Sequence, residues 1–243
     1  MKIEVWSDFV CPFCYIGKRH LEEALAQFPN RDQVEVEFKS FELDPNSPKY
    51  SGESIHEVLA GKYRMSLEQA KQANQSVGQQ AANVGLSYNF DTMKPTNTFD
   101  AHRLAKFAKE HGKETEVTEK LLHAYFTDGK NIGDYETLAD IAAAAGLDSL
   151  EVLNVLQDQT SFANDVRIDE SIAQQYGISG VPYFVINQKY AISGAQPIAT
   201  FLGALQQVWQ EESAAPVVLK DLSTESAEDA TCTDGSCGIP EKK

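Results

Sequence analysis

Two cysteines separated by two residues are the most reactive feature of this sequence. Cys11 and Cys14 enclose Pro12 and Phe13. Residues 3–10 have the composition of an extended strand, and residues 15–25 have helical spacing. The thiols therefore fall at a strand-to-helix junction, where free backbone N–H groups and the helix dipole stabilise a thiolate. This pattern predicts a dithiol that cycles between oxidised and reduced forms.

Half of a zinc site is the alternative interpretation of such a pair. A zinc site needs four ligands, often from a second cysteine pair or from spaced histidines. The five histidines show no such spacing, and the other two cysteines, Cys232 and Cys237, lie at the far end of the chain. We therefore expect redox chemistry at Cys11 and Cys14, and we expect neither a metal nor another cofactor.

A proline at the start of a later strand is the second candidate. Pro182 follows Val181 and precedes an apolar run over residues 183–186. A cis Val181–Pro182 bond would leave the amide and the carbonyl of Val181 free to face a substrate strand. An ordinary trans proline would only begin an edge strand. The residues by themselves leave both interpretations open.

Taken together, these motifs resemble the DsbA-like branch of the thioredoxin superfamily, and most closely its FrnE-type subgroup. The similarity rests on residues 5–19, on the sequence NTFDAHRL at residues 97–104, and on residues 180–184. It extends over residues 1 to about 212. The first and third stretches are specific in combination, whereas no chemistry can be derived from the middle one.

The resemblance implies a role for each motif residue. Cys11 is expected to be the nucleophilic thiol, Cys14 the resolving thiol, and Pro182 the cis-proline that faces them. Val181 is expected to bind substrate through its backbone. Phe13 is expected to contact substrate as well, because the residues between two such cysteines are usually exposed.

The chain departs from the family pattern at two positions. Phe13 stands where DsbA proteins usually have a histidine. The buried acid that many thioredoxins carry six residues before the first cysteine falls here on Val5. The group that accepts the proton of Cys14 is therefore left open between Asp8 and a water molecule.

The predicted fold class is α/β, with a thioredoxin-like core interrupted by a helical insertion. A strand-like stretch over residues 33–43 ends at a Pro-rich breaker, and helical patterns follow to about residue 160. We assign residues 1–45 and 161–212 to the core and residues 46–160 to the insertion. The resemblance implies that the insertion caps the core and walls one side of the active-site groove, whereas periodicity predicts only the helices.

Composition limits the functional classes. The chain has 243 residues, 42% of them hydrophobic, and a formal net charge of −15. The charge argues against binding to nucleic acid or to an anionic membrane surface. The first residues do not resemble a signal peptide, and no run is long enough to span a bilayer. We expect a cytoplasmic protein that acts on protein or small-molecule thiols and disulfides, and the sequence leaves its oligomeric state open.

Residues 213–243 differ in character from the rest of the chain. They are rich in Ser, Thr, Asp and Glu, and they carry Cys232 and Cys237 on either side of an Asp-Gly turn. The sequence therefore predicts a flexible tail with a second redox pair, which FrnE-type proteins can also have. An inert pair of thiols or a weak metal clip is the alternative.

The function predicted from these observations is that of a thiol–disulfide oxidoreductase or isomerase working through a mixed disulfide on Cys11. One alternative is an enzyme similar to kappa-class glutathione transferases and isomerases of the same fold, which typically have serine at the start of this helix. The other is a non-enzymatic protein that holds zinc or acts as a chaperone.

Overall fold

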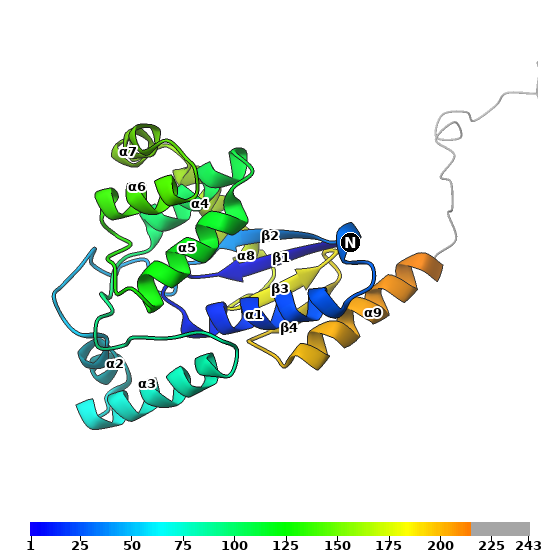
Figure 1. The fold of residues 1–243 in the computed structure, drawn as a ribbon, viewed down its shortest axis with the longest axis horizontal. Helices are drawn as coiled ribbons and strands as arrows, with labels where there is room; N and C mark the ends of the chain where they lie inside the picture. The colour runs from blue at the N-terminus through cyan, green and yellow to red at the C-terminus, as the bar shows by residue number, and fades with distance from the viewer. Residues whose placement is uncertain (215–243) are drawn as a thin grey trace, which may run out of the picture.

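A sheet of four strands forms the centre of the computed structural model, which describes residues 1–214 (Figure 1). The strands are β1 (Lys2–Ser7), β2 (Glu35–Ser40), β3 (Tyr183–Ile186) and β4 (Tyr190–Ser193). Their order in the sheet is β2-β1-β3-β4, with β2 parallel to β1 and the β1–β3 and β3–β4 pairs antiparallel. The predicted α/β class is confirmed.

Strand β1 lies in the interior of the sheet, and side chains cover both of its faces. Ile3 and Val5 pack against α1 (Pro12–Gln27) and α9 (Ile198–Ala214) in one apolar cluster. Trp6 points to the opposite face, where its Nε1 donates a hydrogen bond of 3.1 Å to the carbonyl of Asp169 on α8 (Ala163–Gln175). A strand buried on both faces has an almost continuous apolar sequence, which explains the run at residues 3–10.

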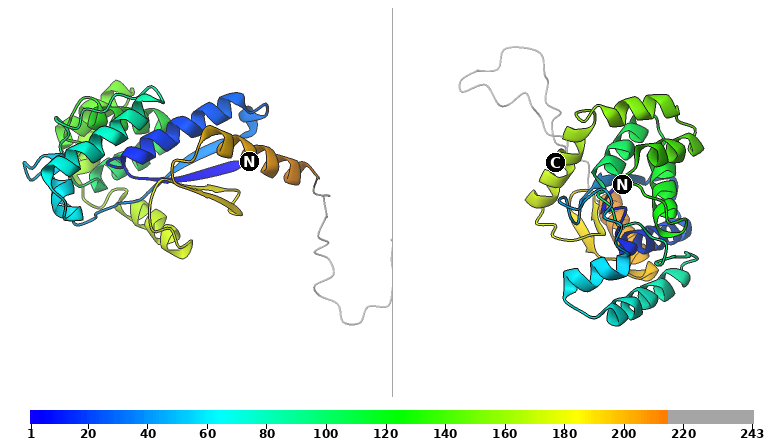
Figure 2. Two further views of the ribbon diagram at one scale, coloured as in Figure 1. Left: turned by 90° about the horizontal axis from the view of Figure 1, so that it is seen from below. Right: turned by 90° about the vertical axis from the view of Figure 1, so that its left-hand side faces the viewer.

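Helices α2 to α8 are placed between β2 and β3 in the chain. The first six of them are α2 (Ile55–Tyr63), α3 (Leu67–Ala82), α4 (Phe99–Glu110), α5 (Glu114–Phe126), α6 (Tyr135–Ala144) and α7 (Ser149–Gln157). Figures 1 and 2 show that the α4–α7 group and the α2–α3 pair both lie at the end of the sheet where β1 ends and α1 begins. No helix within residues 1–214 is long and apolar enough to cross a membrane. The boundaries predicted for the insertion stay a prediction.

The last described helix is longer than its sequence predicts. A helix from Pro197 through Trp209 accounts for the apolar spacing, yet α9 continues to Ala214. Residues 210–213 of this extension are polar and exposed, so no apolar periodicity marks them. The earlier turns of α9 pack against α1 and the sheet, and a helix that has already formed is easily extended by a few more residues.

A buried arginine joins the helices of the α4–α7 group. Arg103 on α4 is fully buried, and its Nη1 donates to Asp100 at 2.7 Å. Its guanidinium also donates to carbonyls at the end of α7 and in the following turn, at Val155, Leu156, Asp158 and Ser161. These carbonyls have no partner within a helix, so the arginine acts as their common cap.

Replacing Arg103 with methionine should lower the free energy of unfolding by about 3–5 kcal/mol, because Asp100 and the carbonyls would lose a buried cationic partner. Urea unfolding followed by circular dichroism measures the loss. Arg31→Met is the matched control, since the Arg31 side chain is 62% exposed, and it should change stability by less than about 0.5 kcal/mol. A similar effect of both substitutions would contradict the role of Arg103.

Candidate active site

The two thiols lie at the start of α1 as the sequence predicts. Cys11 is the residue before the helix, and Pro12 is its first residue, where the missing N–H costs no hydrogen bond. The amide of Cys11 donates to the carbonyl of Asp8 at 3.1 Å, and the amide of Cys14 donates to the carbonyl of Cys11 at 3.0 Å. Both cysteines are free thiols, with exposed fractions of 4% for Cys11 and 3% for Cys14.

Cys11 faces the loop that carries Pro182. Its thiol donates a hydrogen bond of 3.5 Å to the carbonyl of Val181, and the Val181–Pro182 peptide bond is cis. Helix α1 approaches this loop closely at Gly17, where a Cβ atom would lie 3.1 Å from the Pro182 ring and 3.2 Å from Phe184. Glycine at this position therefore lets α1 bring its first turn against the loop.

Cys14 is held as a protonated thiol. Burial is the main cause that raises its pKa well above the ordinary value, and a hydrogen bond with Cys11 raises it further. Hydrogen bonds from the side chain of Ser7 and from the backbone of Asp8 act in the opposite direction. The two cysteines are therefore not equivalent, and Cys14 needs help to become a nucleophile.

An open groove of about 480 Å³ runs between α1, the end of α3 and the Pro182 loop. Phe13 and Val181, the two residues predicted to bind substrate, both line it. Phe13 is 39% exposed, so its ring is available to a ligand. The other residues that line the groove are Ile16, His20, Gln80, Asn83, Val84, Pro182, Gly194 and Ala195.

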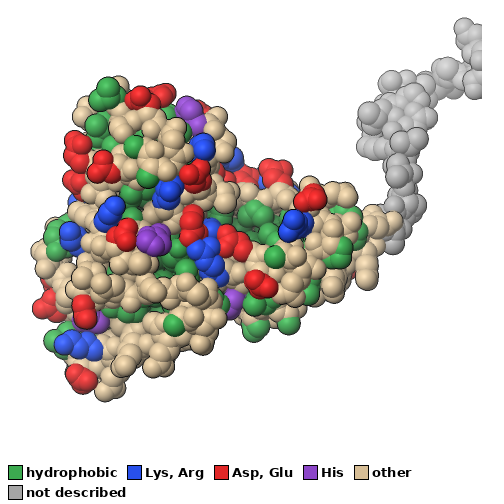
Figure 3. All heavy atoms as spheres, in the orientation of Figure 1, with side chains coloured by type: hydrophobic (Ala, Val, Ile, Leu, Met, Phe, Trp, Pro, Cys, Tyr) green, Lys and Arg blue, Asp and Glu red, His purple; other side chains and the backbone are tan. Residues whose placement is uncertain are grey.

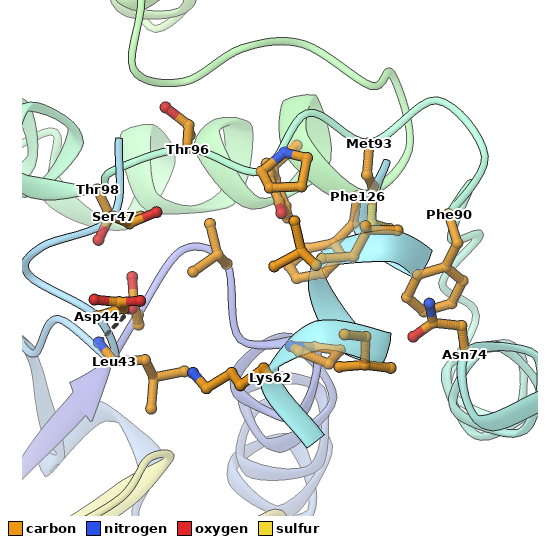
Figure 4. Close-up of a pocket in the computed structure, with 18 of the residues that line it drawn as sticks. Leu43, Asp44, Ser47, Lys62, Asn74, Phe90, Met93, Thr96, Thr98 and Phe126 are labelled. Atoms are coloured by element: carbon orange, nitrogen blue, oxygen red, sulfur yellow. Dashed lines mark hydrogen bonds between the residues drawn. The ribbon is translucent and has the colours of Figure 1, made fainter. Parts of the chain in front are cut away.

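A second cavity, of about 210 Å³, adjoins the motif through Val10 and Pro12 (Figure 4). Its walls are mostly apolar and include Phe90, Met93 and Phe126, which Figure 4 labels. Polar groups stand at its edge, where Lys62 extends from α2 towards Leu43 and Asp44. The sequence analysis did not predict this cavity, because its lining comes from segments that lie far apart in the chain.

A carboxylate from the inserted helices fixes the outer face of α1. Glu119 on α5 accepts hydrogen bonds of 2.5 Å from the Tyr15 hydroxyl and the Lys18 ammonium group, and it also pairs with Arg19. Figure 3 shows acidic and basic side chains side by side over this junction of α5 and α1. Burial raises the pKa of Glu119, but the hydrogen bonds from its three partners outweigh burial and bring the pKa to about 2.

The second predicted redox pair, Cys232 and Cys237, lies outside the described residues. Within residues 1–214, no group of three or more His, Cys, Asp or Glu side chains is placed to hold a metal ion. The described part of the chain thus brings Cys11, Cys14, Val181, Pro182 and Phe13 to one site.

Comparison with known proteins gives consistent results. The family model described as "DSBA-like thioredoxin domain" matches residues 2–206. The uncharacterized protein YwbO of Bacillus subtilis (strain 168) is 31% identical over 185 residues, which are 76% of this chain and 86% of that protein.

Solved structures are similar as well. A probable DsbA oxidoreductase from Streptomyces coelicolor matches with a TM-score of 0.86 and 43% identity, over 91% of this chain and 94% of that one. The cytosolic disulfide reductase DsbM from Pseudomonas aeruginosa, solved with GSH, matches with a TM-score of 0.59 and 12% identity, over 86% of this chain and 100% of that one. The second likeness shows the fold alone.

Replacing Glu119 with glutamine should destabilise the protein by about 1–2 kcal/mol at neutral pH. Converting the whole pKa shift of Glu119 into free energy would give a larger loss of stability, but the carboxylate is partly exposed and solvent screens its interactions. A lowered folded-state pKa stabilises the fold above the unfolded pKa. The difference between parent and variant should therefore shrink as the pH falls from about 4.5 towards 2.

Urea unfolding over this pH range tests the effect of Glu119. Glu116→Gln is the matched control on the same helix, because Glu116 forms only a surface pair with Lys113 at 3.0 Å. Its effect should stay below about 0.5 kcal/mol. A difference between the parent and Glu119→Gln that does not vary with pH would show that the carboxylate charge does not hold α1.

Proposed function

Because the chain belongs to the DSBA-like thioredoxin domain family, we propose that it catalyses thiol–disulfide exchange through Cys11 and Cys14. The DsbA-like resemblance predicted from the sequence is confirmed at the level of the family, and the FrnE-type subgroup stays a prediction. At the general level, the comparisons support a thiol–disulfide oxidoreductase. The observation that carries the proposal is the pair of free thiols at the start of α1, with Cys11 against the Val181 carbonyl.

The reaction proceeds in two displacements. In the reducing direction the Cys11 thiolate attacks one sulfur of a substrate disulfide, forms a mixed disulfide and releases the first substrate thiolate. Cys14 then loses its proton and attacks the sulfur of Cys11. This closes the Cys11–Cys14 disulfide and releases the second substrate thiolate, so the substrate gains the two electrons that the enzyme loses. Oxidation of a substrate dithiol is the reverse of these steps.

The placement of the thiols supports the two proposed roles. Cys11 is the residue directly before the first turn of α1, and its thiol faces the carbonyl of Val181. Cys14 is one turn further into the helix, and burial holds its proton. Cys11 is therefore the group that meets the substrate, and Cys14 acts after the mixed disulfide has formed.

The groove lined by Phe13 and Val181 is the proposed substrate site. Cys11 is only 4% exposed, and its thiol lies against the carbonyl of Val181, which lines this groove. The Val181 backbone can pair with an extended peptide, and the Phe13 ring offers an apolar contact. This chemistry suits protein disulfides and small disulfides alike.

The alternative of a kappa-class glutathione transferase requires one activating group at the start of the helix. Here a second thiol, Cys14, lies next to that group and is hydrogen-bonded to it. A resolving thiol has no part in conjugation, so the pair favours disulfide exchange.

Replacing Cys11 with serine should abolish reduction of a model disulfide, and replacing Cys14 with serine should leave the mixed disulfide trapped on Cys11. Intact-mass spectrometry under non-reducing conditions detects the adduct. Cys14→Ser combined with Cys232→Ser and Cys237→Ser serves as the control, because an adduct on this protein cannot come from the tail. If Cys11→Ser traps the adduct while Cys14→Ser stays active, the two roles are reversed. If neither variant traps an adduct and the parent has no activity, the proposed function is wrong.

A further inference from the structure

Three buried polar atoms without a hydrogen-bond partner lie together beneath the active site. They are Asp8 Oδ1, His102 Nε2 and Thr118 Oγ1, and no other such side-chain atom occurs within residues 1–214. Leaving a buried polar group unpaired costs about 1–3 kcal/mol. Three such groups close together call for an explanation, and a bound water and a catalytic role are the two that surveys of buried polar groups support.

Asp8 and His102 face each other across the junction of β1 and α4. Their side chains are almost fully buried, with Asp8 Oδ1 and His102 Nε2 3.5 Å apart. The other oxygen of Asp8 accepts a hydrogen bond of 2.8 Å from the amide of Leu43, which fixes the carboxylate. The ring of Phe9 packs on His102 with centroids 4.7 Å apart. The imidazole is thus held in place, with its Nε2 atom facing a carboxylate oxygen.

A short polar path leads from this pair to Cys14. The amide of Asp8 donates to Cys14 Sγ at 3.5 Å, and the Ser7 side chain hydrogen-bonds the same thiol. Ser7 also lines a cavity of about 10 Å³, and His102 and Thr118 line it too. A cavity of this size holds roughly one water molecule. Ser7, one water and His102 would therefore connect the resolving thiol to the unpaired nitrogen.

The pair lies between two cavities. Asp8 lines the cavity of about 210 Å³ that adjoins Val10 and Pro12, whereas His102 lines the small cavity at Ser7. Much of the surrounding core is apolar.

We propose that His102, oriented by Asp8, takes up the proton that Cys14 loses when it resolves the mixed disulfide. The proton moves from Cys14 Sγ to the Ser7 hydroxyl, which passes its own proton through the water to His102 Nε2. The Cys14 thiolate then forms a bond to Cys11 Sγ, and the bond from Cys11 to the substrate sulfur breaks. The released substrate thiolate later recovers a proton from His102 or from solvent. This inference rests on the proposed thiol–disulfide exchange.

Other charged and titratable groups face the pair from the neighbouring elements. They are Lys39 on β2, Glu42 in the following segment, Lys106 on α4 and Tyr125 on α5. Both lysines pair with Asp169, and Glu42 pairs with Arg167 at 2.6 Å. Burial and the charge of Asp8 raise the pKa of Tyr125, so it stays protonated. The lysines and Glu42 are thus paired, and Asp8 Oδ1 and His102 Nε2 are left without a partner. Of these two residues, His102 is the one that lines the small cavity together with Ser7.

The two displacements can be timed separately in the full-length chain with Cys232 and Cys237 replaced by serine. Dithiobis(nitrobenzoate) is mixed with the reduced protein in a stopped-flow instrument. The first coloured thiolate reports attack by Cys11, and the second reports resolution by Cys14. In this background His102→Gln should slow the second release about 10- to 100-fold near neutral pH. The first release should change less than about twofold, because Cys11 does not use this path.

The pH profile separates proton uptake from a structural effect. At about pH 10 hydroxide can remove the Cys14 proton unaided, so the second release of His102→Gln should approach the parent rate. His123→Gln is the matched control, since His123 is exposed on α5, and both of its phases should match the parent. Ser7→Ala should slow the second release selectively, as His102→Gln does, and it tests the path if His102→Gln fails to fold.

Three results would overturn the inference. The second release of His102→Gln could equal the parent rate, both releases could slow by the same factor, or the deficit could persist unchanged at alkaline pH. A parent protein that releases only one thiolate would instead overturn the proposed function. The Cys14→Ser protein, which can release only the first thiolate, provides the reference trace for that case.

Discussion

The position of α1 against the sheet is the constraint on which the rest of the structure depends. The first turn of this helix carries both thiols, and three separate parts of the chain position it. Glu119 on α5 binds its outer face, Gly17 allows contact with the Pro182 loop, and the apolar face packs against β1 and α9. A shift of any of these contacts would move Cys11 relative to the Val181 carbonyl. This explains why helices from the middle of the chain gather at the end of the sheet where α1 begins.

The features that could be predicted from the sequence are those set by neighbouring residues. The cysteine spacing, the apolar strand before it and Pro182 before residues 183–186 are local patterns, and each lies where the sequence predicts. The groove around Phe13 and Val181 followed from the family resemblance. In contrast, the Glu119 contacts and the cavity beside Val10 join residues far apart in the sequence, and periodicity carries no information about such pairs.

The role of the motif at residues 97–104 could not be predicted from the sequence either. Its sequence is recognisable, but its chemistry depends on partners that only the fold supplies. Arg103 caps the end of α7, whereas the adjacent His102 faces Asp8 beneath the thiols. Two neighbouring residues on α4 thus have different surroundings. Arg103 holds the inserted helices together, and His102 lies beside the candidate active site. The sequence left the proton acceptor open between Asp8 and water, and it contained no signal for the histidine.

Burial explains why such an acceptor would matter in this chain. Removing Cys14 from water raises its pKa, and a protonated thiol is less easily oxidised than a thiolate. The same burial opposes the second displacement, because the thiolate must form in an apolar surrounding. Thioredoxins that place an acid six residues before the nucleophile have a proton acceptor at that point, whereas Val5 here packs into the core. A buried polar path to a histidine reconciles a protected thiol with a reactive one, because it supplies a base without exposing Cys14 to solvent.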